Sequence, residues 1–423
     1  MVAPGLPLPE LWDHIIGFIP PTSTMTPTLK HLALVCRTFA PAAQRSLFRR
    51  IFIEDGQKVE YERIHLVVDR SAITGAVVAG YLANLLASSP HLLPFVRELK
   101  VESKHAECYH ILSEIPWANL HSLHFKNIFC FPSAAGSAVE ALVSMSSLRR
   151  LEISVYSGTT PYTPTAEWMQ RILLSCSPHV EFLVLEGVYL DTAELSQETN
   201  EHTASRCRPR LRELSLTHCQ GISGLLLHAF DFTASSLRMF QCNDAYDPDI
   251  VPFMRQIGSC VEHLVASCLD SDLEQLDLTA IFPSLTTISA PTPPSLPKPI
   301  CDFSSGLHVY PLASSFNAML RSASTNNKIS RVVFQARVNS FGSKSDIYER
   351  WFKGPIAEFE EVAASQLHAL QVVEVQVDAA VNVQRRIHHY EPYDKVAESV
   401  RNAFPKLHQN GLLAVSLLCP RDE

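Results

Sequence analysis

The sequence has few glycines and lacks the short motifs that glycine-dependent nucleotide sites require. Only 15 glycines occur among the 423 residues, and neither a Gly-x-Gly-x-x-Gly fingerprint nor a P-loop is present. Both motifs need glycine because backbone N–H groups must approach the phosphates closely. A Gly-x-Ser-x-Gly nucleophile elbow is also missing. These absences argue against a nucleotide-binding enzyme and against an α/β-hydrolase serine.

The sequence also lacks the features of secreted and membrane proteins. It has eleven cysteines, an odd number, with no Cys-x-x-Cys pair, and it has no Asn-x-Ser/Thr sequon. No basic segment followed by an apolar one opens the chain, and no uncharged apolar stretch reaches 18 residues. Most cysteines lie in apolar surroundings, which is typical of buried thiols in a reducing compartment. We therefore expect a cytoplasmic or nuclear protein that does not contact a membrane.

The charged residues and histidines form no recognisable catalytic, metal or phosphate-binding pattern. The chain has 35 basic and 43 acidic residues without a long basic run, so we expect no nucleic-acid partner. His121 and His124 would point to opposite faces of a strand, and Cys260, His263 and Cys268 have no second pair of ligands at zinc-site spacing. No nucleophile, base and orienting group come together in the sequence. We expect neither a metal, a cofactor nor enzymatic activity.

The first fifty residues predict three short helices with more apolar surface than they can bury alone. Pro9 suits a first helical turn, and apolar residues follow it at helical spacing to Ile19. Thr26-Pro27 predicts a second helix start, and Pro41 opens a third helix to Phe48. About forty residues rarely form a stable fold without a partner. This segment therefore predicts an interface, although an ordinary N-terminal hairpin packed on its own domain remains an alternative.

The same segment resembles an F-box. The resemblance rests on Leu8-Pro9-Glu10-Leu11, the pair Ile15-Ile16, and Leu32-Ala33-Leu34-Val35-Cys36-Arg37-Thr38-Phe39. The tail from Ala43 to Ile51 resembles fungal F-box proteins with divergent leucine-rich repeats. It departs from the family pattern at Phe39, where an F-box often has tryptophan. The resemblance implies that apolar residues bind the Skp-type adaptor of a Skp–cullin–F-box ubiquitin ligase, namely Leu8, Pro9, Leu11, Ile15, Ile16, Leu32, Val35, Cys36 and Phe39.

Beyond residue 90 the pattern apolar-x-x-apolar-x-apolar recurs eight times. It begins with Val96-Leu99-Val101 and ends with Leu285-Ile288-Ala290, in steps of 24 to 32 residues. The segment Leu211 to Ile222 is the best match to a leucine-rich repeat, with Cys219 at the turn position. Helices are predicted between the strands over 77–88, 135–144, 165–176, 221–233 and 248–260. Strand, helix and parallel strand in succession predict a right-handed repeat solenoid, and the alternative is a generic α/β domain.

The prolines and the changing repeat length suggest the domain boundaries. Six prolines fall within 283–299, and after them the strand motif recurs about every 41 residues, with longer helices predicted over 346–366 and 391–404. We predict an α/β fold with an F-box at 1–53, a leucine-rich-repeat-like solenoid at 54–290, a Pro-rich connection at 291–299 and an α/β continuation with a cap at 300–423. A separate small domain at 300–423 is the alternative.

The residues that flank the central apolar position of each predicted strand would face away from the helices. Apolar members of this set are costly to expose, so a protein partner or a neighbouring loop should cover them. The candidates for binding a protein substrate are Arg150, Phe182, Glu213, Met239, Gln241 and His263.

Three functions follow for the whole chain, in this order. The first is the substrate-recognition subunit of a Skp–cullin–F-box ubiquitin ligase. The second is a leucine-rich-repeat interaction scaffold without a ligase role, and the third is an α/β enzyme whose site the sequence does not reveal. The identity of a substrate, and whether it must carry a modification, are beyond the sequence.

Overall fold

The computed structural model describes the chain from residue 40 to residue 418, with gaps. The described residues are 40–55, 74–127, 133–155, 166–190, 208–232, 236–243, 249–266, 277–290, 312–337, 355–378, 397–398, 400–402 and 404–418. The chain forms two compact units. The first contains residues 1–211 and 219–231, and the second contains residues 212–218 and 232–423.

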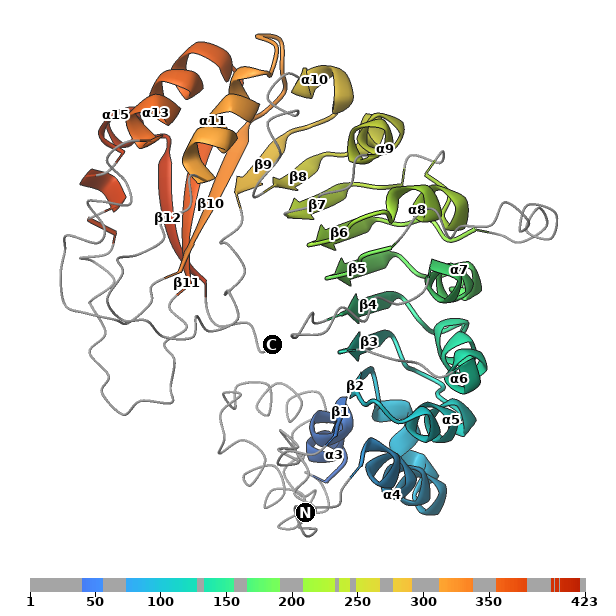
Figure 1. The fold of residues 1–423 in the computed structure, drawn as a ribbon. Helices are drawn as coiled ribbons and strands as arrows, with labels where there is room; N and C mark the ends of the chain where they lie inside the picture. The colour runs from blue at the N-terminus through green and yellow to red at the C-terminus, as the bar shows by residue number, and fades with distance from the viewer. Residues whose placement is uncertain are drawn as a thin grey trace, which may run out of the picture. The chain divides into compact units, whose positions relative to one another are not determined.

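The first unit is built from strands that follow one another in parallel, with helices on one face (Figure 1). Its strands are β1 (Arg50–Glu54), β2 (Glu98–Glu102), β3 (Ser122–Lys126), β4 (Arg150–Ser154) and β5 (Phe182–Glu186). Its helices are α3 (Ala40–Phe48), α4 (Gly75–Ser88), η1 (Pro90–Phe95), α5 (Ala106–Glu114), α6 (Ser133–Val143), α7 (Ala166–Ser175) and α8 (Ser223–Ala229). The result is an α/β unit of repeating strand and helix.

The second unit continues the same alternation. Its strands are β6 (Glu213–Thr217), β7 (Met239–Asn243), β8 (His263–Ala266), β9 (Thr287–Ala290), β10 (Arg331–Arg337), β11 (Val372–Asp378) and β12 (Leu413–Leu418). Its helices are α9 (Ile250–Ile257), η4 (Gly258–Cys260), α10 (Leu278–Ile281), α11 (Leu312–Arg321), α13 (Pro355–Gln366) and α15 (Pro405–Gln409). Every pair of neighbours from β6 to β12 is parallel.

The predicted motif positions form the core of both units. Around β2, for example, Val96, Leu99 and Val101 are at most 1% exposed. Between them, Glu98 and Lys100 are half-buried and Arg97 is exposed. The same alternation recurs in β3, β5 and β6, because successive side chains of a strand point to opposite faces. Burial of these apolar side chains against the helices drives the repeat to fold. The predicted repeating α/β arrangement is therefore confirmed for the described residues.

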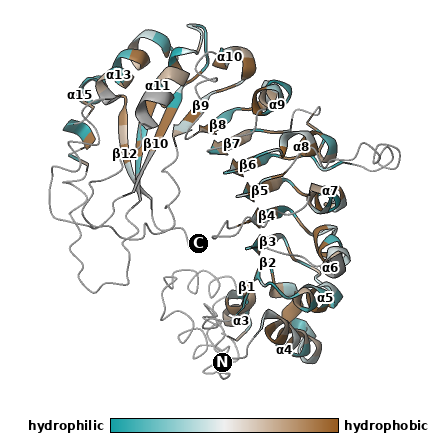
Figure 2. Ribbon diagram, viewed as in Figure 1, coloured by the Kyte–Doolittle hydropathy of each residue, from teal (hydrophilic) through white to brown (hydrophobic). Residues whose placement is uncertain are grey.

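The helix predictions hold with shifts of a few residues. The segment predicted over 77–88 begins earlier, at Gly75, and forms α4, which has no charged residue and is hydrophobic along most of its length (Figure 2). The segment predicted over 221–233 forms only Ser223–Ala229. Helices α5, α10, α11 and α15 lie outside the predicted helix ranges. Helices α10 and α15 have only four and five residues, too few to show a helical period.

The parts of the chain around the expected domain boundaries are only partly described. Strand β1 crosses the expected boundary at residue 53 and pairs with β2. The Pro-rich connection at 291–299 lies outside the described residues, as does the start of the helix predicted over 346–366. Strand β10 pairs in parallel with β9, so the strands after residue 300 continue the sheet of the second unit.

Cys219 occupies the turn position that the repeat pattern gives it. Its side chain is fully buried, and its Sγ atom donates to the backbone oxygen of Leu185 at 3.4 Å. The buried thiol at this turn therefore satisfies a backbone oxygen that water cannot reach.

Candidate functional site

The open face of each unit carries the side chains that alternate with the buried motif positions. In the first unit the strand register aligns Arg50, Glu98, Ser122, Arg150 and Phe182 in one row across the strands. Parallel strands repeat this alignment at every second residue. A ligand on this face would therefore meet five strands at once.

The structure groups the six predicted substrate-binding residues within their own units. Arg150 and Phe182 are direct partners on β4 and β5. Glu213, Met239 and His263 form one row across β6, β7 and β8. The sixth, Gln241, lies two residues along β7 from Met239. Arg150 is exposed, and the other five are half-buried.

The residues predicted to bind the adaptor all precede Ala40. Leu8, Pro9, Leu11, Ile15, Ile16, Leu32, Val35, Cys36 and Phe39 therefore lie outside the described residues. The third predicted helix is described and forms α3. It packs against η1 and β1 and buries Ala42, Ala43 and Leu47.

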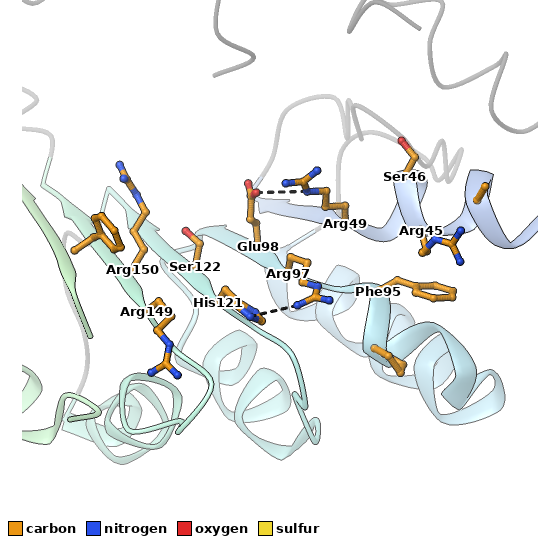
Figure 3. Close-up of a pocket in the computed structure, with 13 residues that line it drawn as sticks. Arg45, Ser46, Arg49, Phe95, Arg97, Glu98, His121, Ser122, Arg149 and Arg150 are labelled. Atoms are coloured by element: carbon orange, nitrogen blue, oxygen red, sulfur yellow. Dashed lines mark hydrogen bonds and ion pairs between the residues drawn. The ribbon is translucent and has the colours of Figure 1, made fainter. Parts of the chain in front are cut away.

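A cavity of about 710 Å³ lies at the start of the strands of the first unit (Figure 3). We name it the arginine groove, because five arginines line it and Glu98 is the one carboxylate among its lining residues. It extends from α3 past the strand starts to Phe182 on β5. Its lining residues are Ala42, Arg45, Ser46, Arg49, Pro94, Phe95, Arg97, Glu98, His121, Ser122, Arg149, Arg150 and Phe182.

The repeat itself brings these arginines together. In each motif the first residue after the leading apolar position precedes the strand, and in neighbouring repeats this residue is Arg97, His121 or Arg149. The backbone N–H groups of His121 and Ser122 donate to the oxygen of Arg97, at 2.8 and 3.0 Å. Those of Arg149 and Arg150 donate to the oxygen of His121, both at 2.9 Å. Basic residues of separate repeats are thus held side by side at one edge.

Among the residues that the structure describes, the side chains of Arg97 and Arg149 contact no carboxylate. Nη1 of Arg97 lies 3.2 Å from Nε2 of His121, whose Nδ1 contacts the backbone oxygen of Asn119 (Figure 3). The carbonyl oxygen can only accept and the guanidinium can only donate, so the imidazole of His121 donates from Nδ1 and accepts at Nε2. Nη1 of Arg149 donates to the backbone oxygen of His179 at 3.2 Å. Neither contact supplies a negative charge.

Two further arginines of the groove, Arg49 and Arg150, form weak ion pairs. Nε of Arg49 lies 4.0 Å from Glu98, and that carboxylate is 2.7 Å from Nε of Arg50. Nη2 of Arg150 lies 3.5 Å from Glu152. The Arg49 side chain is 62% exposed, so water screens its pair strongly. One carboxylate is therefore shared by two arginines at this end of the groove.

Four groove arginines are absent from the predicted binding residues, although the sequence holds a signal for them. The segment Phe48-Arg49-Arg50-Ile51 follows the same apolar-x-x-apolar pattern as the later motifs, and it leads into β1. Read as the first motif, it would have aligned Arg49 with Arg97 and Arg149. Arg45 lies on α3, and nothing in the strand pattern predicts its position.

A histidine, a serine and two glutamates form a network on the same open face. Nε2 of His124 lies 3.2 Å from Oγ of Ser154 and 3.5 Å from Glu152. The hydroxyl of Ser154 donates to Glu186 at 3.1 Å. Burial, reinforced by Lys100, Lys126 and Arg150, lowers the pKa of His124 to about 3. Burial also raises the pKa of Glu152.

This network does not have the geometry of an activated nucleophile. Because the single proton of Ser154 goes to Glu186, the neutral His124 must donate its own Nε2–H to Ser154. A general base would have to accept the serine proton at that nitrogen. The network therefore binds strands β3, β4 and β5 together, and it does not prepare Ser154 for attack.

A related contact occurs in the second unit. Nε2 of His263 lies 2.7 Å from Oγ of Ser289, and burial, together with Arg331, lowers the pKa of His263. Nearby, burial alone would raise the pKa of Glu374, but hydrogen bonds from Arg331, Gln376 and Ser416 outweigh it and hold that pKa below its usual range. His263 is thus engaged by its own unit.

The described part of the chain shows neither a cluster of metal ligands nor a membrane-spanning helix. Within it, no group of three or more histidine, cysteine, aspartate and glutamate residues is placed to hold a metal ion. Among the same residues, no helix has the length and apolar character needed to span a membrane.

No protein-family model matches the chain, and no curated protein is similar enough to count as a match.

Proposed function

We propose that this protein is the substrate-recognition subunit of a Skp–cullin–F-box ubiquitin ligase. In this proposal the segment before Ala40 is an F-box that binds the Skp-type adaptor. The repeating body is a divergent leucine-rich-repeat solenoid, and its open face binds a protein substrate. The receptor would contribute proximity and orientation, and its partners would supply the bond chemistry.

The observation that carries the proposal is the junction between α3 and β1. Only Arg49 separates Phe48, the end of the helix, from Arg50, the start of the strand. Helix α3 also packs against η1 and β1, burying Ala42, Ala43 and Leu47. The last helix of the F-box-like segment is therefore part of the unit that carries the arginine groove. Such a junction suits a receptor that must hold a substrate at a defined distance from its adaptor.

The same junction favours a second candidate function, an interaction scaffold without a ligase role. The buried face of α3 contacts this chain's own η1 and β1. If the two preceding helices pack in the same way, their apolar residues would serve the fold and no adaptor would bind. The two candidates therefore differ in what covers Ile15 and Leu32.

Capture by the adaptor distinguishes the two candidates. We expect purified Skp-type adaptor to retain the full-length protein and to lose the double variant Ile15→Asp/Leu32→Asp, since a buried unpaired carboxylate costs about 2 kcal/mol or more. A matched control, Val77→Asp/Tyr81→Asp, changes two apolar residues of α4 that are 40% and 48% exposed. This control should be captured as well as the parent protein.

The readout must separate lost binding from lost folding. Circular dichroism of all three proteins should give the same spectrum and the same melting profile. Equal capture of the Ile15→Asp/Leu32→Asp variant and the parent protein would contradict the ligase proposal and favour the scaffold.

A further inference from the structure

We propose that the arginine groove binds a short acidic peptide, with carboxylate or phosphate oxygens on Arg97 and Arg149 and an apolar side chain against Phe182. This inference rests on the proposed function, because it names the chemistry of the substrate segment that the open face would hold. Of the residues that line the groove, only Arg150 and Phe182 are among the predicted substrate-binding residues.

The charge of the groove is opposite to that of the whole protein. The chain has a formal net charge of −8, yet five arginines and one glutamate line this cavity. Clustering like charges costs energy, and a fold tolerates it where a ligand of opposite charge compensates. The clustering also follows the register, since the residue before the strand is Arg49, Arg97, His121 and Arg149 in the first four repeats and Glu181 in the fifth.

Arginine suits this role better than a diffuse positive surface would. Its guanidinium presents several N–H donors in a planar fork that matches the two oxygens of a carboxylate or phosphate. Arg97 and Arg149 each contact a neutral acceptor, His121 and the oxygen of His179. These contacts orient the side chains while the positive charges remain available to an anion.

Both ends of the groove add apolar surface. Phe182 and its register partner Arg150 line one end, and Pro94-Phe95 of η1, which packs against α3, line the other (Figure 3). The rings of Phe95 and Phe182 are half-buried, so each keeps part of its surface for a ligand. A free inorganic anion has no apolar group to pack against this surface, whereas a peptide offers apolar side chains beside its acidic ones.

The rest of the open face favours a peptide over a nucleic acid. Four residues along the strands from the groove row, the register aligns Glu54, Glu102, Lys126, Ser154 and Glu186. Lys126 pairs with Glu102 at 2.9 Å, but three carboxylates against one lysine leave the row negative. This row repels a polyanion that carries a charge at every nucleotide. A peptide with its acidic residues gathered at one position avoids that row.

The inference is tested by fluorescence anisotropy on the full-length protein with labelled synthetic peptides. One peptide has glutamates around a central leucine, a second has phosphoserines in the same places, and a third has neutral serines. We expect both acidic peptides to bind at least about tenfold more tightly than the neutral one, and added salt to weaken both. The stronger of the two identifies carboxylate or phosphate as the preferred oxyanion.

Matched variants locate the binding. Arg97→Gln/Arg149→Gln should weaken the acidic peptides by about tenfold or more, because two charge-assisted contacts are lost. Arg238→Gln/Arg321→Gln removes the same charge from exposed side chains of the second unit, so it should change affinity less than about twofold. Glu98→Gln should strengthen binding, because it removes the carboxylate that lines the groove.

Three results would overturn the inference: equal binding of neutral and acidic peptides, equal loss in the two arginine double variants, or tighter binding of a single-stranded RNA of similar length. Adaptor capture of the parent protein is measured alongside. If the adaptor captures the parent protein but the parent binds neither acidic peptide, the groove inference fails and the ligase proposal stands. If peptides bind but the adaptor does not, the reverse holds.

Discussion

The Nε2 atom of His124 lies 3.2 Å from Oγ of Ser154, and the serine hydroxyl donates to Glu186. Three neighbouring strands of the first unit are joined by this chain of hydrogen bonds. The direction of the serine proton fixes His124 as the donor at Nε2. Burial lowers the pKa of His124 and keeps its imidazole neutral.

The neutrality of His124 predicts a loss of stability in acid. The unfolded chain takes up the imidazole proton near pH 6.5, whereas burial and nearby Lys100 lower the pKa in the folded chain to about 3. Between these values the unfolded state binds more protons, so stability falls as the pH falls. The contribution of this one group is about 2 kcal/mol lower at about pH 5 than at about pH 8.

The measurement is urea unfolding of the parent protein and of His124→Gln at several pH values. Glutamine can donate to Ser154 but does not titrate. The stability of the His124→Gln variant should therefore depend less on pH between 6.5 and about 3. Glu152 has a raised pKa in the folded state, so its contribution to stability increases as the pH falls. Glu152 is present in both proteins. Identical pH profiles would show that His124 does not contribute.

The cysteines of the described residues should differ sharply in reactivity. Burial raises the pKa of Cys176 to about 12, and burial, partly offset by a hydrogen bond with Ser103, raises that of Cys108 to about 12. Thiolate is the reactive form, so both should resist alkylation at neutral pH. Cys260 is only partly buried and should react first. Mass spectrometry after brief iodoacetamide treatment checks this order, with urea-unfolded protein as the control; early labelling of Cys108 would contradict its burial.

Replacing Gly187 or Gly80 by alanine should change the stability of the protein in opposite directions. Gly187 has a φ of +68°, and an added Cβ would lie 2.0 Å from the backbone oxygen of Val155. Gly187→Ala should therefore destabilise the protein by about 2 kcal/mol or more. Gly80 lies within α4, and an added Cβ would meet nothing within 4 Å. Gly80→Ala should stabilise by about 0.5–1 kcal/mol, because glycine is a poor helix former.

Thermal unfolding followed by circular dichroism measures both changes. The melting temperature should fall for Gly187→Ala and rise slightly for Gly80→Ala. A fall of similar size in both variants would mean that the loss of flexibility, and not the clash with Val155, determines the result.

The repeat was predictable because its signal is local and repeated. Each strand motif places three apolar residues within six positions, and β2 to β9 all arise where that motif occurs. The short helices were harder, since α5 mixes His110 and Cys108 with only a few apolar residues. Of the candidate binding residues, the pair Arg150 and Phe182 does line a cavity. The arginines that precede the strands do not lie on a strand face, so the alternation of residues along each strand does not predict them.

The sequence alone determined the repeating α/β character of this protein, because alternating burial along each strand is written into the order of its residues. The proposed F-box rests on the sequence alone, on residues between Leu8 and Ile51. Only the tertiary structure decided which polar residues meet. Arg49, Arg97 and Arg149 are about fifty residues apart in sequence, and parallel register brings them to one edge. Charge clustering of this kind depends on the alignment of separate repeats, and no single repeat contains it.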